Sequence, residues 1–288
     1  MLIDLHTHTH CSDGTLSPCD LIDYAKKSAI GVLAVTDHDE LGANIPAQRH
    51  GREVGVEVIP GVELSIDEPQ ENGQVHILGL FIDPENRVLQ ESLFHLKQAR
   101  VSRAKKIIHL LNEQGMTLHY TELAEIIGTG SAGRPHIAAL LMKKRIVSSM
   151  DEAFKKYLSK GKCAYVPKKK LKLQPAIDLI HEAGGLAILA HPNSLDFYSY
   201  SQLQKDIVKM REQGLDGIEV FYPSHDKYFT QWLLNLARQH QLAVSGGSDF
   251  HGACKPEIQI GIGWGNLCIP VEIVTELKKK LAAALSEK

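Results

Sequence analysis

The sequence predicts an α/β fold of the (β/α)-barrel kind. Short apolar runs recur along the chain, most of them ending in a polar residue, and helical segments separate several of these runs. Continuous apolar runs bounded by glycine and polar turns are typical of strands buried on both faces of a parallel sheet. In a (β/α) barrel, functional side chains lie at the carboxyl ends of such strands. A doubly wound open sheet is the alternative architecture.

Seven runs are predicted as strands, in the order that the chain presents them. They lie at residues 2–6, 31–38, 56–63, 75–80, 185–191, 217–222 and 243–249. Helices are predicted between them at 18–28, 174–183, 201–213 and 228–240. No GxGxxG or P-loop motif follows a predicted strand, which argues against binding of a nucleotide cofactor.

Residues 99–166 interrupt this alternation with helical segments alone, predicted at 99–114, from Thr121 onward, at 136–145 and at 151–158. We therefore expect a barrel formed by residues 1–98 and 167–288, with an all-helical insertion at 99–166. Residues 99–172 carry 16 basic and 5 acidic side chains, a net charge of +11 within a chain of net charge −2. One interpretation is a basic lid over the active site that attracts a polyanion, and the other is a solvated helical surface.

The composition is that of an ordinary globular protein, with 288 residues of which 43% are hydrophobic. No run approaches the about 18 apolar residues of a membrane span, and the first ten residues lack the apolar core of a signal peptide. Five cysteines, an odd number without a CxxC pair, indicate neither a disulfide framework nor a cysteine-ligated zinc site. We expect a reducing, cytoplasmic compartment.

Histidines and carboxylates gather at or near the predicted strand ends. The nine candidates for metal binding are His6, His8, Asp13, His38, Glu63, His76, His191, Asp249 and His251. Imidazole and carboxylate ligands without cysteine are typical of catalytic zinc, manganese or iron sites. Nine ligands exceed the needs of one ion, so two or three ions are expected, an arrangement suited to in-line displacement at phosphorus. The pattern favours phosphoester hydrolysis.

These residues lie in motifs that resemble those of the polymerase and histidinol phosphatase (PHP) family. The motifs are Asp4-Leu5-His6-Thr7-His8, Ser12-Asp13-Gly14, Thr36-Asp37-His38, Gly61-Val62-Glu63, Ala190-His191-Pro192 and Ser248-Asp249-Phe250-His251. The resemblance implies a distorted (β/α)7 barrel with a trinuclear metal centre. It further implies that Asp13, His38 and His251 hold one ion, and that the other six candidates hold two.

Two further motifs resemble one branch of that family, the RNase AM-like enzymes, which hydrolyse nucleoside 3′,5′-bisphosphates and trim short RNA from the 5′ end. These motifs are Gly133-Arg134-Pro135-His136 and Tyr222-Pro223-Ser224-His225. The resemblance implies that Arg134, His136 and His225 act as catalytic residues that hold the phosphate while a hydroxide bridging the metals attacks phosphorus. A guanidinium grips phosphate with a planar fork. The alternative reading of Arg134 and His136 is a helix start, and that of His225 is a loop residue.

We therefore expect a cytoplasmic, metal-dependent phosphoesterase that acts on a nucleoside bisphosphate such as pAp, or on short 5′-phosphorylated RNA as a 5′-3′ exoribonuclease. Manganese is the expected metal, with iron or zinc as alternatives, and neither a membrane nor an obligatory protein partner is inferred. Two other functions stay open: a histidinol-phosphate-type phosphatase, and a non-catalytic metal- or nucleic-acid-binding module. No role is predicted for His10, Cys11 or Lys168–Lys172.

Overall fold

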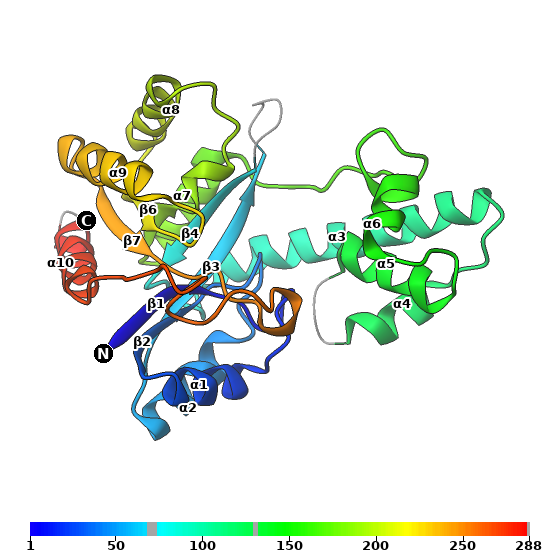
Figure 1. The fold of residues 1–288 in the computed structure, drawn as a ribbon, viewed down its shortest axis with the longest axis horizontal. Coiled ribbons are helices and arrows are strands. Elements are labelled where there is room, and N and C mark those ends of the chain that lie inside the picture. Colours follow the sequence, from blue (N-terminus) through cyan, green and yellow to red (C-terminus); the bar gives the residue numbers. More distant parts are fainter. Residues whose placement is uncertain (68–73, 129–131, 287–288) are drawn as a thin grey trace. The chain divides into compact units, whose positions relative to one another are not determined.

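The computed structural model describes residues 1–67, 74–128 and 132–286, which form two compact units. The first unit comprises residues 1–91 and 170–288, and the second comprises residues 92–169. All seven strands belong to the first unit and form one sheet, in which they follow one another in chain order (Figure 1). The predicted α/β class is confirmed.

The first and last strands of this sheet meet at their carboxyl ends. The strands are β1 (Leu2–Thr7), β2 (Ile30–Val35), β3 (Glu57–Ile66), β4 (Val75–Leu80), β5 (Leu186–Leu189), β6 (Gly217–Phe221) and β7 (Ala243–Gly246). Beyond β7, the Asp249 N–H donates to the His6 carbonyl at 2.9 Å, and the His8 N–H donates to the Phe250 carbonyl at 2.9 Å. The segment that follows β7 therefore returns to β1, as in a barrel.

Strand β4 departs from the all-parallel arrangement that the apolar runs predicted. It runs antiparallel to both β3 and β5, whereas every other pair of neighbours is parallel. Residues 67–74, which join β3 to β4, are too few for the crossover of a dozen or more residues that a parallel connection requires. The reversal brings the start of β4, rather than its end, to the edge where the other strands terminate.

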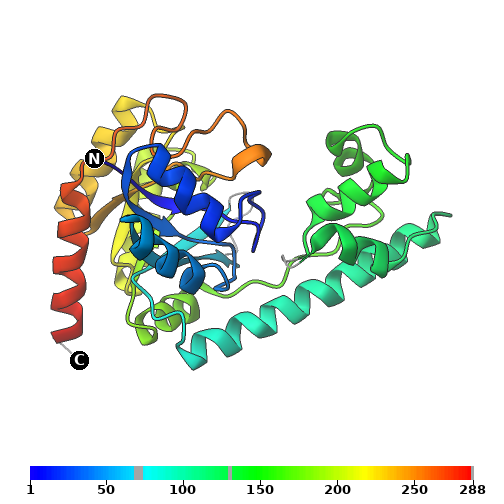
Figure 2. The ribbon, with the colours of Figure 1, turned by 90° about the horizontal axis from the view of Figure 1, so that it is seen from below.

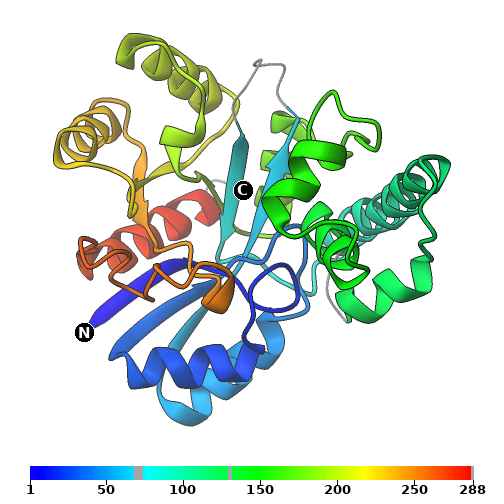
Figure 3. The same cartoon turned by 45° about the vertical axis from the view of Figure 1, so that its right-hand side comes forward.

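Helices cover the outside of the sheet. They are α1 (Pro18–Lys27), α2 (Asn44–Val54), α7 (Leu173–Glu182), α8 (Tyr200–Glu212), α9 (Lys227–Gln239) and α10 (Glu272–Ser286). Helices α1 and α2 pack side by side (Figure 3), and α10 lies against β7 (Figure 2). The sequence did not predict α2, because it buries only Asn44, Ala47 and Gly51 and so shows little apolar periodicity. It did not predict α10 either.

The second unit is all-helical and has its own hydrophobic core, which includes Ile107, Leu123, Ile137 and Leu141. Its helices are α3 (Arg87–Glu113), which begins in the first unit, α4 (Tyr120–Ile127), α5 (Arg134–Lys143) and α6 (Met150–Ala153), which continues as a π-helical turn (Phe154–Leu158). Helix α3 begins earlier than the predicted Ala99, since the Asn86 side chain accepts a hydrogen bond from the Leu89 N–H at 3.0 Å and caps it.

A buried carboxylate in β1 fixes the segment that follows β7. Asp4 is fully buried and accepts hydrogen bonds from the backbone N–H groups of Ser248, at 2.9 Å, and Gly261, at 2.7 Å. Gly247 passes so close to β1 that a Cβ there would lie within 3.0 Å of three atoms of His6. Glycine at this position therefore permits the close approach that brings Asp249 beside β1.

Among the described helices, none is both long and apolar enough to cross a membrane.

Candidate metal centre

Six strands deliver the nine predicted metal-binding side chains to one edge of the sheet. His6 lies in β1, Glu63 in β3 and His76 at the second position of β4. The remaining six follow strands within a few residues: His8 and Asp13 after β1, His38 after β2, His191 after β5, and Asp249 and His251 after β7. The antiparallel direction of β4 explains why His76 joins the others from the start of its strand.

The carboxylate of Glu63 lies at the centre of the cluster and is 1% exposed. Its Oε1 lies 2.8 Å from His76 Nδ1 and 3.1 Å from His191 Nε2. Its Oε2 faces three further imidazole nitrogens: His6 Nε2 at 3.3 Å, His8 Nε2 at 3.2 Å and His38 Nδ1 at 3.0 Å. Each oxygen thus faces a different set of histidines.

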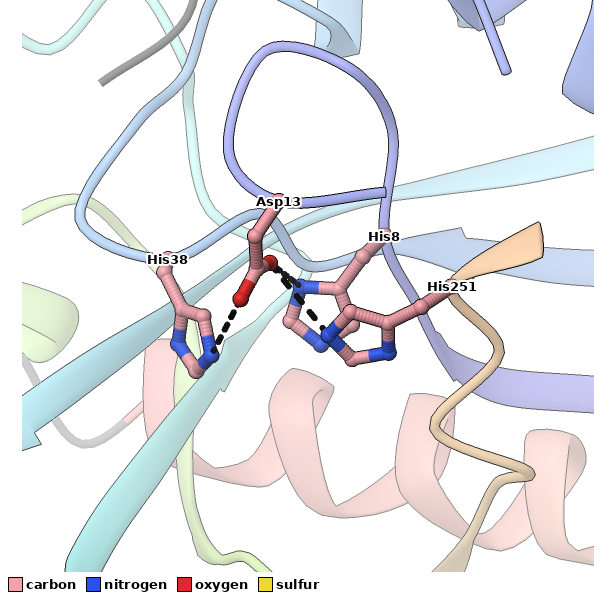
Figure 4. A group of neighbouring side chains, drawn as sticks. All are labelled: His8, Asp13, His38 and His251. Atoms are coloured by element: carbon pink, nitrogen blue, oxygen red, sulfur yellow. Dashed lines mark ion pairs between the residues drawn. The ribbon is translucent and has the colours of Figure 1, made fainter. Parts of the chain in front are cut away.

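A second group surrounds Asp13 (Figure 4). Its Oδ1 lies 3.3 Å from His251 Nε2 and 3.7 Å from His8 Nδ1, and its Oδ2 lies 3.7 Å from His38 Nε2. His8 and His38 each direct one ring nitrogen to this group and the other to Glu63. Two shared imidazoles therefore join the Asp13 group to the Glu63 group.

Asp249 completes the cluster with one oxygen and is held by the other. Its Oδ1 lies 3.2 Å from His8 Nε2 and 3.6 Å from His6 Nε2. Its Oδ2 accepts hydrogen bonds from the Tyr222 hydroxyl at 3.0 Å and from Lys255 Nζ at 2.6 Å. Tyr222 and Lys255 were not predicted as site residues, and their contacts fix which oxygen of Asp249 faces the histidines.

The donor atoms of the cluster fit divalent cations. Four buried polar atoms here lack a hydrogen-bond partner among the described residues: His6 Nε2, His8 Nε2, His38 Nδ1 and Glu63 Oε2. An unsatisfied buried polar atom is costly, and cations shared among these atoms would satisfy them. Three sets of neighbouring ligand atoms lie close enough together for one ion each: His8, Asp13, His38 and His251; His6, His8 and Glu63; and His38, Glu63 and His76.

The electrostatics of the cluster also favour a cation. Burial acts to lower the pKa of His8, but Asp249 and Glu63 outweigh it and raise that pKa to about 10. Burial likewise opposes ionisation of Asp13, yet the hydrogen bond from His251 and the neighbouring imidazoles hold its pKa well below the usual range. The carboxylates thus stay ionised and attract positive charge, which a proton or a metal ion can supply.

Glu219 supports two of the histidines, and sequence reasoning missed it. It lies fully buried in β6, with Oε1 3.0 Å from His6 Nδ1, and its Oε2 accepts the His191 N–H at 2.7 Å. His191 has a positive φ of 28°, a strained conformation that this hydrogen bond helps to hold. A lone carboxylate in an apolar strand was the available signal, since a buried charge requires partners.

Asp37 organises the loop that carries Asp13. It accepts hydrogen bonds from the Thr9 N–H at 2.8 Å, the Thr9 hydroxyl at 2.6 Å and the Ser12 hydroxyl at 2.5 Å. The Cys11 N–H donates to the Thr9 hydroxyl oxygen at 3.1 Å in the same loop. Asp37 therefore holds Thr9 and Ser12 in place, and these two residues position Asp13 in the same loop.

The three predicted phosphate-binding residues belong to different units. His225 lies in the first unit and is 7% exposed, with Nδ1 2.9 Å from the Val220 carbonyl and Nε2 3.1 Å from Asn193 Oδ1. Arg134 and His136 open α5 in the second unit. Arg134 Nη1 donates to the Leu158 carbonyl at 3.2 Å, and His136 Nδ1 accepts the Gly133 N–H at 3.2 Å.

A family model described as the PHP domain matches residues 4–241 of this chain. Two curated relatives align over most of both chains. The 5'-3' exoribonuclease Rnm of Escherichia coli is 37% identical over 263 residues, covering 91% of this chain and 88% of that enzyme. The 3',5'-nucleoside bisphosphate phosphatase of Chromobacterium violaceum is 34% identical over 255 residues, covering 86% of this chain and 87% of that enzyme.

Two solved structures resemble the whole chain. An amidohydrolase from Chromobacterium violaceum, solved with bound sulfate and no metal, is 31% identical with a TM-score of 0.80 and covers 97% of each chain. A protein from Bifidobacterium adolescentis, assigned as a metal-dependent phosphoesterase, is 27% identical with a TM-score of 0.81 and covers 96% of each chain.

Proposed function

The chain belongs to the PHP domain family, and we propose that it is a metal-dependent phosphoesterase that acts on nucleoside 3′,5′-bisphosphates such as pAp and on the 5′ end of short RNA. The observation that carries this proposal is the position of Glu63 between five imidazoles, with Asp13 and Asp249 completing the cluster. Relatives that align over most of the chain are named for those two activities, which supports the choice of substrates.

In this proposal, the nine clustered side chains hold two or three divalent ions, with manganese as the first candidate and iron or zinc as alternatives. The ligand sets are His38, Glu63 and His76; His6, His8 and Glu63; and His8, Asp13, His38 and His251. Bound divalent ions neutralise charge on phosphate oxygens and acidify water for attack on phosphorus. Tyr222 and Lys255 keep Asp249 oriented, and Glu219 keeps His6 and His191 oriented, so that the ligand atoms are in place before substrate binds.

Arg134, His136 and His225 hold the substrate phosphate in this proposal. Burial lowers the pKa of His225, so its ring is neutral at neutral pH. Its Nδ1–H donates to the Val220 carbonyl, which leaves Nε2 beside the exposed Asn193 side chain. A phosphate dianion near Nε2 favours the protonated ring, which then donates a hydrogen bond to a phosphate oxygen in place of its contact with Asn193.

The proposal includes a cytoplasmic site of action and no obligatory protein partner. All five cysteines are free thiols, as is usual in a reducing compartment.

The test is an assay with added manganese against pAp, short 5′-phosphorylated RNA and histidinol phosphate, with metal content measured on the same sample. We expect turnover of pAp or RNA, and His191→Ala protein prepared in parallel controls for contaminating phosphatase. Turnover of histidinol phosphate alone would instead support the monoesterase. Metal or RNA binding without any turnover would support the non-catalytic module.

A further inference from the structure

Four aromatic rings pack together where the loop before α8 meets α9, two neighbouring helices (Figures 1 and 3). They are the rings of Phe197, Tyr200, Phe229 and Trp232, which we call the aromatic cluster. Tyr200 stacks on Trp232 with centroids 4.9 Å apart, and Phe197 stacks on Phe229 with centroids 6.0 Å apart. The planes of the stacked pairs differ by 12–23°, so the cluster presents its rings in nearly one orientation.

A line of ring contacts joins the aromatic cluster to the candidate metal centre. His191 contacts Tyr222 with ring centroids 5.5 Å apart, and Tyr222 contacts His225 with centroids 5.3 Å apart. His225 in turn makes an edge contact with Phe229, with centroids 4.8 Å apart and planes at 88°. The aromatic cluster therefore begins one ring contact beyond His225, the residue proposed to hold the substrate phosphate.

The aromatic cluster reaches the surface among exposed tyrosines. Tyr200 is 44% exposed, while Tyr198, before α8, and Tyr228, in the first turn of α9, are 93% and 85% exposed. These three are the exposed large hydrophobic residues of the segment 193–240, all of which the structure describes. Contiguous exposed hydrophobic surface marks an interaction site, and a surface made of ring faces suits a planar ligand.

The charge of the same segment is close to neutral. Residues 193–240 carry 5 basic and 6 acidic side chains, and 5 − 6 gives −1. Phosphate contacts would therefore add little to the affinity of a nucleic acid here, and the affinity would come from bases stacked on rings. Such stacking accepts every base, because every base has a π-face. An exonuclease needs this tolerance, since each base of its substrate passes the site in turn.

We propose that the aromatic cluster, with Tyr198 and Tyr228, is a stacking surface for RNA bases. The bases it takes are those that follow, toward the 3′ end, the phosphate held by His225. This choice of ligand rests on the proposed function, because RNA has nucleotides beyond that phosphate and pAp has none. The ring contacts that lead from His225 to Tyr200 supply the path from the metal centre to this surface.

The experiment removes the ring and the bases separately, as a double-mutant cycle. Fluorescence anisotropy measures how a 5′-phosphorylated RNA of about six nucleotides binds to metal-free protein, and a second RNA lacks the bases beyond its first nucleotide. We expect Tyr200→Ala to weaken binding of the intact RNA about 5- to 150-fold, the usual cost of losing one base–ring stack. Its binding of the second RNA and of pAp stays as in the wild type. Tyr200→Phe, which keeps the ring, is expected to bind the intact RNA as the wild type does.

Tyr24→Ala is the matched control, because Tyr24 is 40% exposed and also stacks on one ring, that of Phe250. Equal weakening of RNA binding in Tyr24→Ala and Tyr200→Ala would overturn the surface, and so would equal weakening for the two RNAs. Tyr228→Ser tests the same surface through a side chain that is mostly exposed, and it is expected to weaken binding of the intact RNA at least about fivefold. Circular dichroism melting of each variant reports whether the fold is intact.

The outcomes separate this surface from the proposed function. Base-dependent loss of affinity in Tyr200→Ala would support the surface even in a protein that hydrolyses nothing. Hydrolysis of RNA with the same RNA affinity in Tyr200→Ala, Tyr228→Ser and the wild type would support the proposed function and overturn the surface. A wild-type dimer in sedimentation that Tyr200→Ala dissociates would assign the rings to a second copy of the chain and would also overturn it.

Discussion

His6 Nδ1 and Glu219 Oε1 lie 3.0 Å apart, and both side chains are fully buried. Because a carboxylate accepts and does not donate, Glu219 keeps a proton on His6 Nδ1, and Nε2 is then the ring nitrogen that would bind a cation beside Glu63 and Asp249. The other oxygen of Glu219 accepts the His191 N–H, so one carboxylate orients two candidate ligands that come from different strands. Such carboxylate–histidine contacts orient the ligands of metal sites in general.

Glu219→Gln is expected to weaken metal binding about 10- to 100-fold, the usual effect of losing a contact of this kind. Glu219 uses both oxygens as acceptors, whereas glutamine has one acceptor and would direct its NH2 group at a donor. Competition with a chelator measures the affinity, and Glu212→Gln, at the exposed end of α8, is the matched control. Wild-type metal affinity in Glu219→Gln would show that His6 and His191 are oriented by other contacts.

Gly247→Ala is expected to destabilise the fold by about 1–3 kcal/mol, since overpacking a closely packed contact costs that much. The added methyl group would overlap His6, and β1 and the segment after β7 would have to separate. Chemical denaturation of the metal-free protein measures the loss. Gly42→Ala serves as the control, because the nearest heavy atom to its added Cβ lies at 3.5 Å, an ordinary contact distance. Equal stability of the two variants would contradict this account.

The sequence predicted the α/β class and the cluster of nine side chains for the same reason: most of the candidate ligands follow or end a short apolar run. His76 fitted that pattern poorly, and its place became clear only with the antiparallel direction of β4. The length of the connection at residues 67–74 could have indicated an antiparallel β4, because a parallel crossover needs more residues. The apolar run of β4 itself resembles that of a parallel strand. Local pattern thus identified the strand without its direction.

The supporting contacts were beyond sequence reasoning because their partners are distant along the chain. Glu219 lies 213 residues from His6 and 28 from His191, so nothing in its own strand reveals what it holds. For His225, the motif predicted a contact with the substrate phosphate, and the fold brings the Val220 carbonyl and Asn193 to its two nitrogens.

Metal affinity is expected to rise with pH between pH 6 and pH 8. Burial acts to lower the pKa of His8, but Asp249 and Glu63 raise it to about 10, so the metal-free protein holds a proton on this ring throughout that range. An imidazole must be deprotonated to bind a metal, and each proton displaced makes the affinity rise about tenfold per pH unit. Chelator competition at three pH values measures the slope. A metal affinity that does not change with pH would mean that metal binding does not displace a proton from His8.

Asp13→Ala and His191→Ala are expected to lose metal in different amounts and to lose hydrolysis equally. Asp13 is the carboxylate of the group in Figure 4, so its removal should cost about one bound ion while the Glu63 group persists. His191→Ala leaves Glu63 Oε1 with His76 as its neighbour and weakens the other side of the cluster. Turnover of a phosphoester should fall at least about 100-fold in both, because a metal centre contributes several kcal/mol to such a reaction. Elemental analysis of purified protein gives the ion count, and His109→Ala, an exposed histidine of α3, controls for the loss of an imidazole. Wild-type metal content and turnover in Asp13→Ala would show that the Asp13 group does not bind an ion of the metal centre.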